Sequence, residues 1–133
     1  MASAADPPSL IDIDIFIDDA RGIPAATAFL TARLAAGDLR MSVMSAMELV
    51  QGCRDRAALA RVRQLLQSVT IVPVDAATSQ TALQLMDTYF LSHGLLIADA
   101  LIAATALEHG LTLYTRNVRD FQMIPSLIVK RPY

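Results

Sequence analysis

The residues of this sequence that are best suited to catalysis are acidic, and they fall in three separate segments. Asp12 and Asp14 alternate with isoleucines in LIDIDIFIDD, Glu48 lies in MSAMELVQG, and Asp99 precedes the apolar run ALIAATAL. Carboxylates among large apolar side chains are costly unless they are solvated, paired or bound to a metal. Several carboxylates in one cleft repel one another and raise each other's pKa unless a cation is present. Oxygen ligands without His or Cys favour hard ions, Mg²⁺ or Mn²⁺, over zinc.

Each of these acids also has an ordinary structural explanation. Alternation with a period of two is typical of a strand with one solvent-exposed face, which would account for Asp12 and Asp14. Ser45 and Glu48 have the spacing of a capping box. Asp99 stands where an aspartate often caps a helix. Taken one at a time, the three segments are compatible both with a structural role and with a role in metal binding or catalysis.

A fourth polar segment, YTRNVRDF, contains Thr115, Asn117 and Asp120. All three are ordinary turn residues, and hydrogen bonds within a loop would account for them. The segment nevertheless follows an expected strand at its carboxyl end, as Asp12 and Asp14 are also expected to do. In parallel α/β folds, chemistry gathers outside the carboxyl ends of the strands.

The elements that must position these residues alternate along the chain. We expect strands at residues 10–17, 39–44, 70–74, 111–115 and 127–129, and helices at residues 24–36, 45–50, 54–68, 75–91 and 98–109. Strands that alternate with helices imply parallel pairing through right-handed crossovers. The predicted fold class is therefore α/β, a three-layer α/β/α sandwich with a short, mostly parallel sheet.

Composition limits the class of protein. The chain has 133 residues, of which 54% are hydrophobic, and a single cysteine, Cys53. A chain of this length folds without disulfides or structural metals. Because one cysteine cannot form an internal disulfide, we expect a protein of the reducing cytoplasm. The net charge of −2 provides no overall basic field that would recruit nucleic acid.

Neither a membrane span nor a signal peptide is expected. The most apolar stretch, residues 95–107, is interrupted by Asp99 and is too short to cross a bilayer. The first nine residues lack a basic residue ahead of an apolar run. We expect a flexible lead-in at residues 1–9, followed by a single domain over residues 10–133.

Together and in this order, the acidic segments resemble a known family. The similarity lies in LIDIDIFIDDARG, SAMELVQG and GLLIADALIAATALEHGLTLYTRNVRDFQMIPSL, and it extends from residue 10 to about residue 129. These segments resemble the PIN-domain ribonucleases, and specifically the VapC-like toxins of toxin–antitoxin pairs. The last segment is the most specific, because it matches in both residue type and spacing.

The resemblance implies an acidic centre at Asp12, Glu48 and Asp99. Either Asn117 or Asp120 would complete it, and we favour Asp120 as the fourth acid. Asp12 and Asp99 would be the principal metal ligands, and Glu48 would bind metal or orient water. Supporting positions would be Asp14, Thr115 and Asn117. Arg116 and Arg119 flank this centre in the sequence and are candidates for contacts with RNA phosphates.

The activity that the resemblance implies is hydrolysis of RNA by a Mg²⁺- or Mn²⁺-dependent endoribonuclease, leaving 3′-hydroxyl and 5′-phosphate ends. Such ions stabilise the attacking and leaving oxygens at a phosphodiester. The resemblance also implies a homodimer and a cognate antitoxin protein that holds the toxin inactive.

Two alternatives remain open at this point. Ile13 stands where the family commonly has Thr or Ser, and Asn117 is neutral where many relatives carry an acid, which would suit a catalytically silent PIN fold that acts as an interaction module. The second alternative is a phosphoacceptor receiver domain, another small α/β unit with clustered acids. That fold would require a lysine near the site, whereas the only lysine is Lys130.

Overall fold

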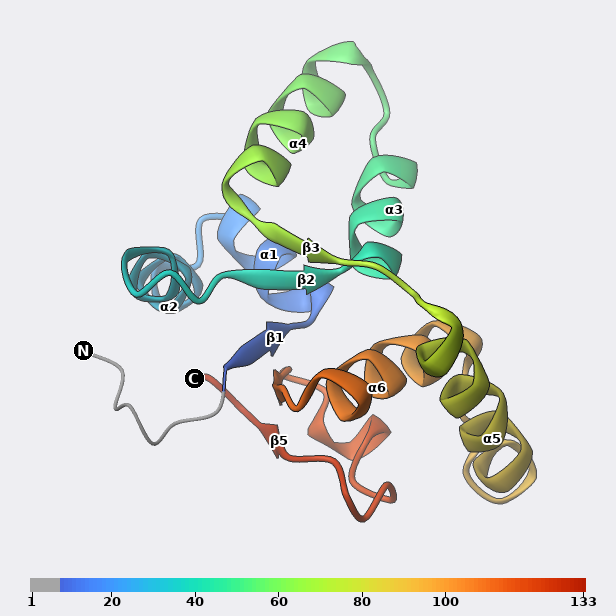
Figure 1. The fold of residues 1–133 in the computed structure, drawn as a ribbon. Coiled ribbons are helices and arrows are strands. Elements are labelled where there is room, and N and C mark those ends of the chain that lie inside the picture. Colours follow the sequence, from blue (N-terminus) through green and yellow to red (C-terminus); the bar gives the residue numbers. More distant parts are fainter. Residues whose placement is uncertain (1–7) are drawn as a thin grey trace.

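The computed structural model describes residues 8–133, in which short strands alternate with longer helices (Figure 1). The strands are β1 (Ser9–Ile11), β2 (Arg40–Ser42), β3 (Thr70–Val72), β4 (Thr112–Tyr114) and β5 (Val129–Lys130). The helices are α1 (Ile13–Ala20), α2 (Pro24–Ala35), α3 (Val43–Gln51), α4 (Arg56–Ser68), α5 (Ala76–His93) and α6 (Ile97–His109), with a single 3₁₀ turn, η1 (Val118–Asp120). Most of the expected lead-in, residues 1–9, lies outside the described residues, and its last residue, Ser9, is buried at the start of β1.

All strand pairs are parallel, as the sequence predicts. Strand β4 lies between β1 and β5, and β2 pairs separately with β3. Polar contacts join the two groups: the Ser9 hydroxyl donates to the Asp38 carboxylate at 2.9 Å, and the Arg40 guanidinium donates to the Ser9 carbonyl at 3.5 Å. The beginnings of β1 and β2 are thereby tied together.

The two faces of β1 are buried in two different cores. Leu10 packs with α5 and α6, in a cluster that includes Leu113 of β4. Ile11, the next residue, packs with α1 and α2, in a cluster that includes Met41 of β2. Alternate strand residues point to opposite faces, so helices cover the sheet on both sides. The predicted three-layer α/β fold class is confirmed.

The predicted first strand, residues 10–17, is wrong beyond Ile11. The strand ends there, Asp12 caps the next helix by accepting a hydrogen bond from the Ile13 amide at 2.9 Å, and α1 begins. The period-two pattern of isoleucines indicated a strand, but β-branched residues are also tolerated in a helix whose apolar face is buried. Ile15 and Phe16 form that buried face.

The capping box that would have explained Glu48 structurally is not formed in the described residues. Helix α3 begins earlier, at Val43, and Ser42 caps it by accepting from the Met44 amide at 3.1 Å. Ser45 therefore lies inside the helix, and Glu48 lies in its second turn. Capping does not explain the Glu48 carboxylate.

Helix α6 runs beside α5 on one side of the sheet (Figure 1). Most of its buried residues are alanines, whose small side chains let the neighbouring helix approach closely. Leu96 occupies the N-cap position without a side-chain bond, so Asp99 stands in the first turn rather than at the cap. Within residues 8–133, no helix is both long and apolar enough to cross a membrane.

Candidate active site

Asp12 and Thr115 meet because each directly follows a central strand. Strands β1 and β4 are parallel neighbours, with Ile11 opposite Tyr114, and the Asp12 amide continues the ladder by donating to the Tyr114 carbonyl at 2.9 Å. The carboxyl ends of β1 and β4 therefore lie side by side at the same edge of the sheet. Asp12 is only 5% exposed there.

The turn after β4 holds both aspartates of the first segment. The Thr115 hydroxyl donates to Oδ2 of Asp12 at 2.8 Å and lies 3.3 Å from Oδ2 of Asp14. The Asp14 oxygen also accepts from the Arg116 amide at 2.9 Å and from the Asn117 side-chain amide at 3.4 Å. All three supporting positions expected from the sequence, Asp14, Thr115 and Asn117, therefore lie in one hydrogen-bonded group.

Burial and mutual repulsion raise the pKa values of the acids at this edge. The pKa of Asp12 rises to about 7, first because of its burial and then because of the negative charges on Asp14 and Asp99. The pKa of Asp99 rises to about 6 through burial and through repulsion by Asp120, Glu48 and Asp14. The structure thus brings all five acids of the sequence prediction into electrostatic contact.

These residues fit a hard divalent cation by the chemistry of their donors. Every donor is a carboxylate oxygen, and Oδ1 of Asp14 is buried without a hydrogen-bond partner among the described residues. Across residues 8–133, no three acidic, histidine or cysteine side chains are already close enough to enclose an ion. A cation would neutralise the repulsion that raises the pKa of Asp12 and Asp99.

Arg116 is less available to RNA than the sequence suggested, because it is paired with Asp18. Its Nη1 atom donates to both carboxylate oxygens of Asp18, at 3.1 and 2.8 Å. The Tyr133 hydroxyl donates to Asp18 at 2.7 Å, and the Arg131 side chain donates to the Arg116 carbonyl at 3.3 Å. We call Asp18, Arg116, Arg131 and Tyr133 the C-terminal clamp.

Sequence reasoning missed Asp18 and Tyr133. Asp14 and Asp18 are four residues apart, a spacing that places both on one helix face, but the expected strand concealed this signal. Tyr133 is bonded to a residue 115 positions earlier, so no local pattern marks it. Hydrogen bonding from Tyr133, together with the positive charge of Arg116, lowers the pKa of Asp18.

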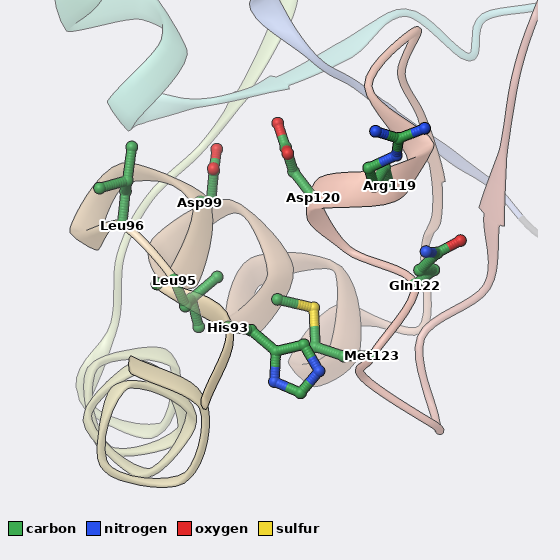
Figure 2. Close-up of a pocket in the computed structure, with 9 residues that line it drawn as sticks. His93, Leu95, Leu96, Asp99, Arg119, Asp120, Gln122 and Met123 are labelled. Atoms are coloured by element: carbon green, nitrogen blue, oxygen red, sulfur yellow. The ribbon is translucent and has the colours of Figure 1, made fainter. Parts of the chain in front are cut away.

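A cavity of about 530 Å³ opens beside Asp99 and Asp120. Figure 2 shows these two carboxylates next to each other at one end of the cavity, with His93 and Met123 at the other end. Arg119 and Gln122 line the side formed by the segment after β4 (Figure 2). The sequence placed Arg119 and Asp120 near the site but gave no indication of His93 or Gln122.

The chain is similar to known proteins over most of its length. The family model described as PIN domain matches residues 10–125. Ribonuclease VapC10 of Mycobacterium tuberculosis is 37% identical over 119 residues, which cover 89% of this chain and 89% of the relative. Ribonuclease VapC19 of the same organism is 35% identical over 120 residues, covering 89% of this chain and 95% of the relative.

The fold is also similar to solved structures. A chain of a toxin–antitoxin complex from Klebsiella pneumoniae superposes with a TM-score of 0.76 at 30% sequence identity. The superposition covers 94% of this chain and 98% of the Klebsiella chain. The match to the PIN-domain family model, over residues 10–125, includes the strand ends and the turn that hold the acidic residues.

Proposed function

Because this chain belongs to the PIN-domain family, among the VapC-like ribonucleases, we propose that it is an endoribonuclease that cleaves RNA with the help of Mg²⁺ or Mn²⁺. The observation that supports this activity best is the burial of Asp12 at the end of β1 together with the crowding of other carboxylates around it, which raise the pKa of Asp12 to about 7. A functional site is the usual place for such a shift. The all-carboxylate donor set favours a hard cation.

Each acid has a distinct part in this proposal. Asp12 and Asp99 hold the cation, and Glu48 either binds it or orients the attacking water. Asp120, whose negative charge raises the pKa of Asp99, is the remaining acid of the site. The bound cation supplies Lewis-acid stabilisation of the charge that develops at the phosphodiester.

The residues around the acids position them. Thr115 donates to Asp12 and so fixes the orientation of its carboxylate. Asn117 and the Arg116 amide do the same for Asp14. Residues that orient metal ligands in this way commonly change metal affinity by about 10- to 100-fold.

We also propose that the protein is the toxin of a toxin–antitoxin pair and acts in the cytoplasm as a homodimer. The antitoxin is proposed from the similarity to the toxin–antitoxin complex from Klebsiella pneumoniae. Support for the homodimer comes from an apolar face at the junction of α5 and α6. This face consists of Phe90, Leu91, Leu96 and Ile97, which are 51%, 95%, 64% and 67% exposed.

The proposed activity is tested with pure protein and structured RNAs, in Mn²⁺ and in EDTA. We expect cleavage only with the metal, and product ends that are 3′-hydroxyl and 5′-phosphate. Asp12→Asn and Asp99→Asn should each abolish cleavage, whereas Asp87→Asn, a change at an exposed position of α5, should not. If both site variants cleave as well as the unchanged protein, the assigned site is wrong.

A catalytically silent PIN fold is the second candidate, because Ile13, directly after Asp12, has no hydroxyl to offer the site. In this structure Thr115 provides a hydroxyl to Asp12 instead. Calorimetry with Mn²⁺ separates the two candidates: an enzyme binds the ion and loses binding in Asp12→Asn, and a silent module shows no binding that depends on the carboxylates. The receiver-domain alternative is wrong, since the chain belongs to a different family.

A further inference from the structure

The cavity beside the acidic centre extends beyond the carboxylates that the proposed reaction uses. Its volume of about 530 Å³ lies within the range typical of small-ligand sites. The acids occupy one end only, and the walls on the other side come from the end of α5 and from the segment after η1 (Figure 2). Metal binding therefore leaves a large part of this cavity without a role.

The walls away from the acids combine apolar surface with hydrogen-bonding groups. Leu95 is 2% exposed and Met123 is half-buried, so both present fixed apolar surface to the cavity. His93 adds a flat ring, which packs edge-on against the ring of Tyr89 with 5.8 Å between the ring centroids. Its Nδ1 atom is also hydrogen-bonded to the Ser92 hydroxyl at 2.7 Å.

Two further residues of the segment around η1 line the cavity. Gln122 contributes an amide that both donates and accepts hydrogen bonds. Arg119 contributes a positive charge, and among residues 8–133 it has no carboxylate partner within 4.0 Å.

We propose that this cavity is a nucleobase subsite, which holds the base of a nucleotide adjoining the bond that is cleaved. The base stacks against His93 and Met123, Gln122 reads its hydrogen-bonding edge, and Arg119 contacts a neighbouring phosphate. This assignment rests on the proposed ribonuclease activity and specifies how that site selects its substrate.

A base fits these walls better than a phosphate does. Leu95 and Met123 line the cavity away from Asp99 and Asp120, and their apolar side chains offer no hydrogen bond to a phosphate. A base is uncharged, has two flat faces for stacking and presents donors and acceptors along its edge. Proteins that recognise RNA by sequence commonly take up unstacked bases in this way.

The subsite is also fixed in position relative to the acids. Gly94, in the left-handed conformation with φ of 68°, ends α5 and turns the chain toward α6. Its amide donates to the Phe90 carbonyl at 2.7 Å. His93 and Asp99 thus lie on either side of one tight connection, so a base bound at His93 has a defined distance to the acidic centre.

The first test measures the base preference of cleavage. A single-stranded RNA pool with a randomised central segment is cut in Mn²⁺, and the cleavage sites are sequenced. We expect the unchanged protein to prefer one base next to the cleaved bond by about tenfold or more, since reading one base edge discriminates by that amount.

His93→Ala and Gln122→Ala should reduce this preference to about threefold or less. The loss of kcat/KM on the preferred RNA should fall mainly on KM, and the affinity for Mn²⁺ should stay unchanged. Gln80→Ala, at an exposed position of α5, is the matched control and should keep the preference. If His93→Ala and Gln122→Ala both retain the full preference, or if the unchanged protein has none, the nucleobase subsite is wrong.

The second test does not depend on catalysis. The four nucleosides, which carry no phosphate, are titrated into the protein while the amide signals of Gly94, Leu95 and Met123 are followed by NMR. We expect one nucleoside to shift these signals and Gln122→Ala to weaken the effect. Shifts without any cleavage would contradict the ribonuclease and leave the subsite standing, whereas cleavage with no such shifts would overturn the subsite alone.

Discussion

At the scale of single residues, the burial of Asp12 is costly to the folded protein when no cation is bound. Hydrogen bonds from Thr115 and the Ile13 amide lower its pKa, but burial and the neighbouring acids still raise it to about 7. An unfolded chain would leave this carboxyl at its ordinary pKa of 3.8. Acids retained in such positions are typical of sites where function, rather than stability, selects the residue.

This difference predicts how stability depends on pH in the metal-free protein. Because the pKa of Asp12 is higher in the folded chain, the folded state binds the proton more tightly. The resulting stabilisation is complete below the unfolded pKa of 3.8 and is lost as the pH rises through about 7. Asp99, with a pKa of about 6, changes stability in the same direction.

In EDTA, the midpoint temperature of thermal unfolding should therefore decrease as the pH is raised from about 4 to about 7. Asp12→Asn should flatten this fall and should raise the midpoint at the higher pH by roughly 3 to 6 °C, about 1 kcal/mol. Differential scanning calorimetry measures both effects, with Asp87→Asn as the control. A midpoint that is constant with pH, or lower in Asp12→Asn, would contradict the buried charge.

The residues of the site differ in how far the sequence predicts them. Asp12, Glu48 and Asp99 stand among apolar residues, and this local contrast marks each of them. Asp18 and Tyr133 are joined only in the folded chain, so neither has a local signal. Sequence reasoning finds residues whose neighbours make them costly and misses residues whose partners are distant.

At the scale of elements, the turn after β4 determines the geometry of the site. The Thr115 hydroxyl donates to Asp12 and accepts from the Asn117 amide at 3.0 Å, so one side chain connects the turn to the acid. Thr115 is completely buried. Its loss would leave the Asp12 carboxylate without its strongest neutral donor.

Thr115→Val keeps the shape of the side chain but removes the hydroxyl. We expect the affinity for Mn²⁺ to fall by about tenfold and cleavage to fall with it, because the carboxylate is no longer oriented. Thr115→Ser restores the hydroxyl and should recover most of the affinity. Isothermal calorimetry with Mn²⁺ distinguishes these outcomes, and equal affinities in all three proteins would exclude an orienting role.

The C-terminal clamp supports the same turn from the other side. Asp18 of α1 binds Arg116, whose own amide holds Asp14. Asp18→Asn removes one charge of the pair, and we expect a several-fold weaker affinity for Mn²⁺ with a lower unfolding midpoint. Asp19→Asn, the adjacent acid, is the control for charge. Tyr133→Phe removes one hydrogen bond from Asp18 and should have a smaller effect in the same direction.

The sequence predicts the location of most elements but neither helix α1 nor the start of α3. Strands β2, β3 and β4 lie within the predicted residues 39–44, 70–74 and 111–115. Residues 13–17 form a helix because Asp12 caps it and because the strand, only three residues long, ends at Ile11. The β-branched composition of residues 13–17 favours a strand, but burial of Ile15 and Phe16 in the folded protein stabilises a helix there.

At the scale of the whole molecule, the net charge of −2 is a poor guide to binding. The acids gather at the ends of β1 and β4, where a bound cation would offset them, and Arg119 stands beside them with no carboxylate partner among residues 8–133. The total charge hides this uneven distribution of acidic and basic side chains. The distribution of charge favours a face that binds metal first and RNA afterwards.

The apolar face at the junction of α5 and α6 predicts self-association. Leu91 and Ile97 are among its most exposed members, and exposed apolar patches commonly mark interfaces. The paired change Leu91→Asp with Ile97→Asp should convert a dimer to a monomer in sedimentation velocity. Ile128→Asp, at an exposed position outside this face, is the control. A protein that is monomeric without any substitution would contradict the homodimer.

The order of strands has one more consequence, which concerns the synthesis of the chain. Strand β4 pairs directly with β1, and the bond from Thr115 to Asp12 spans 103 positions. A ribosome that has made only the first hundred residues has released Asp12 and Glu48 but not the turn that orients them. We therefore expect a nuclease with this site to be inactive during its own translation, so that the messenger and ribosomal RNA beside the nascent chain are spared until the last strands emerge.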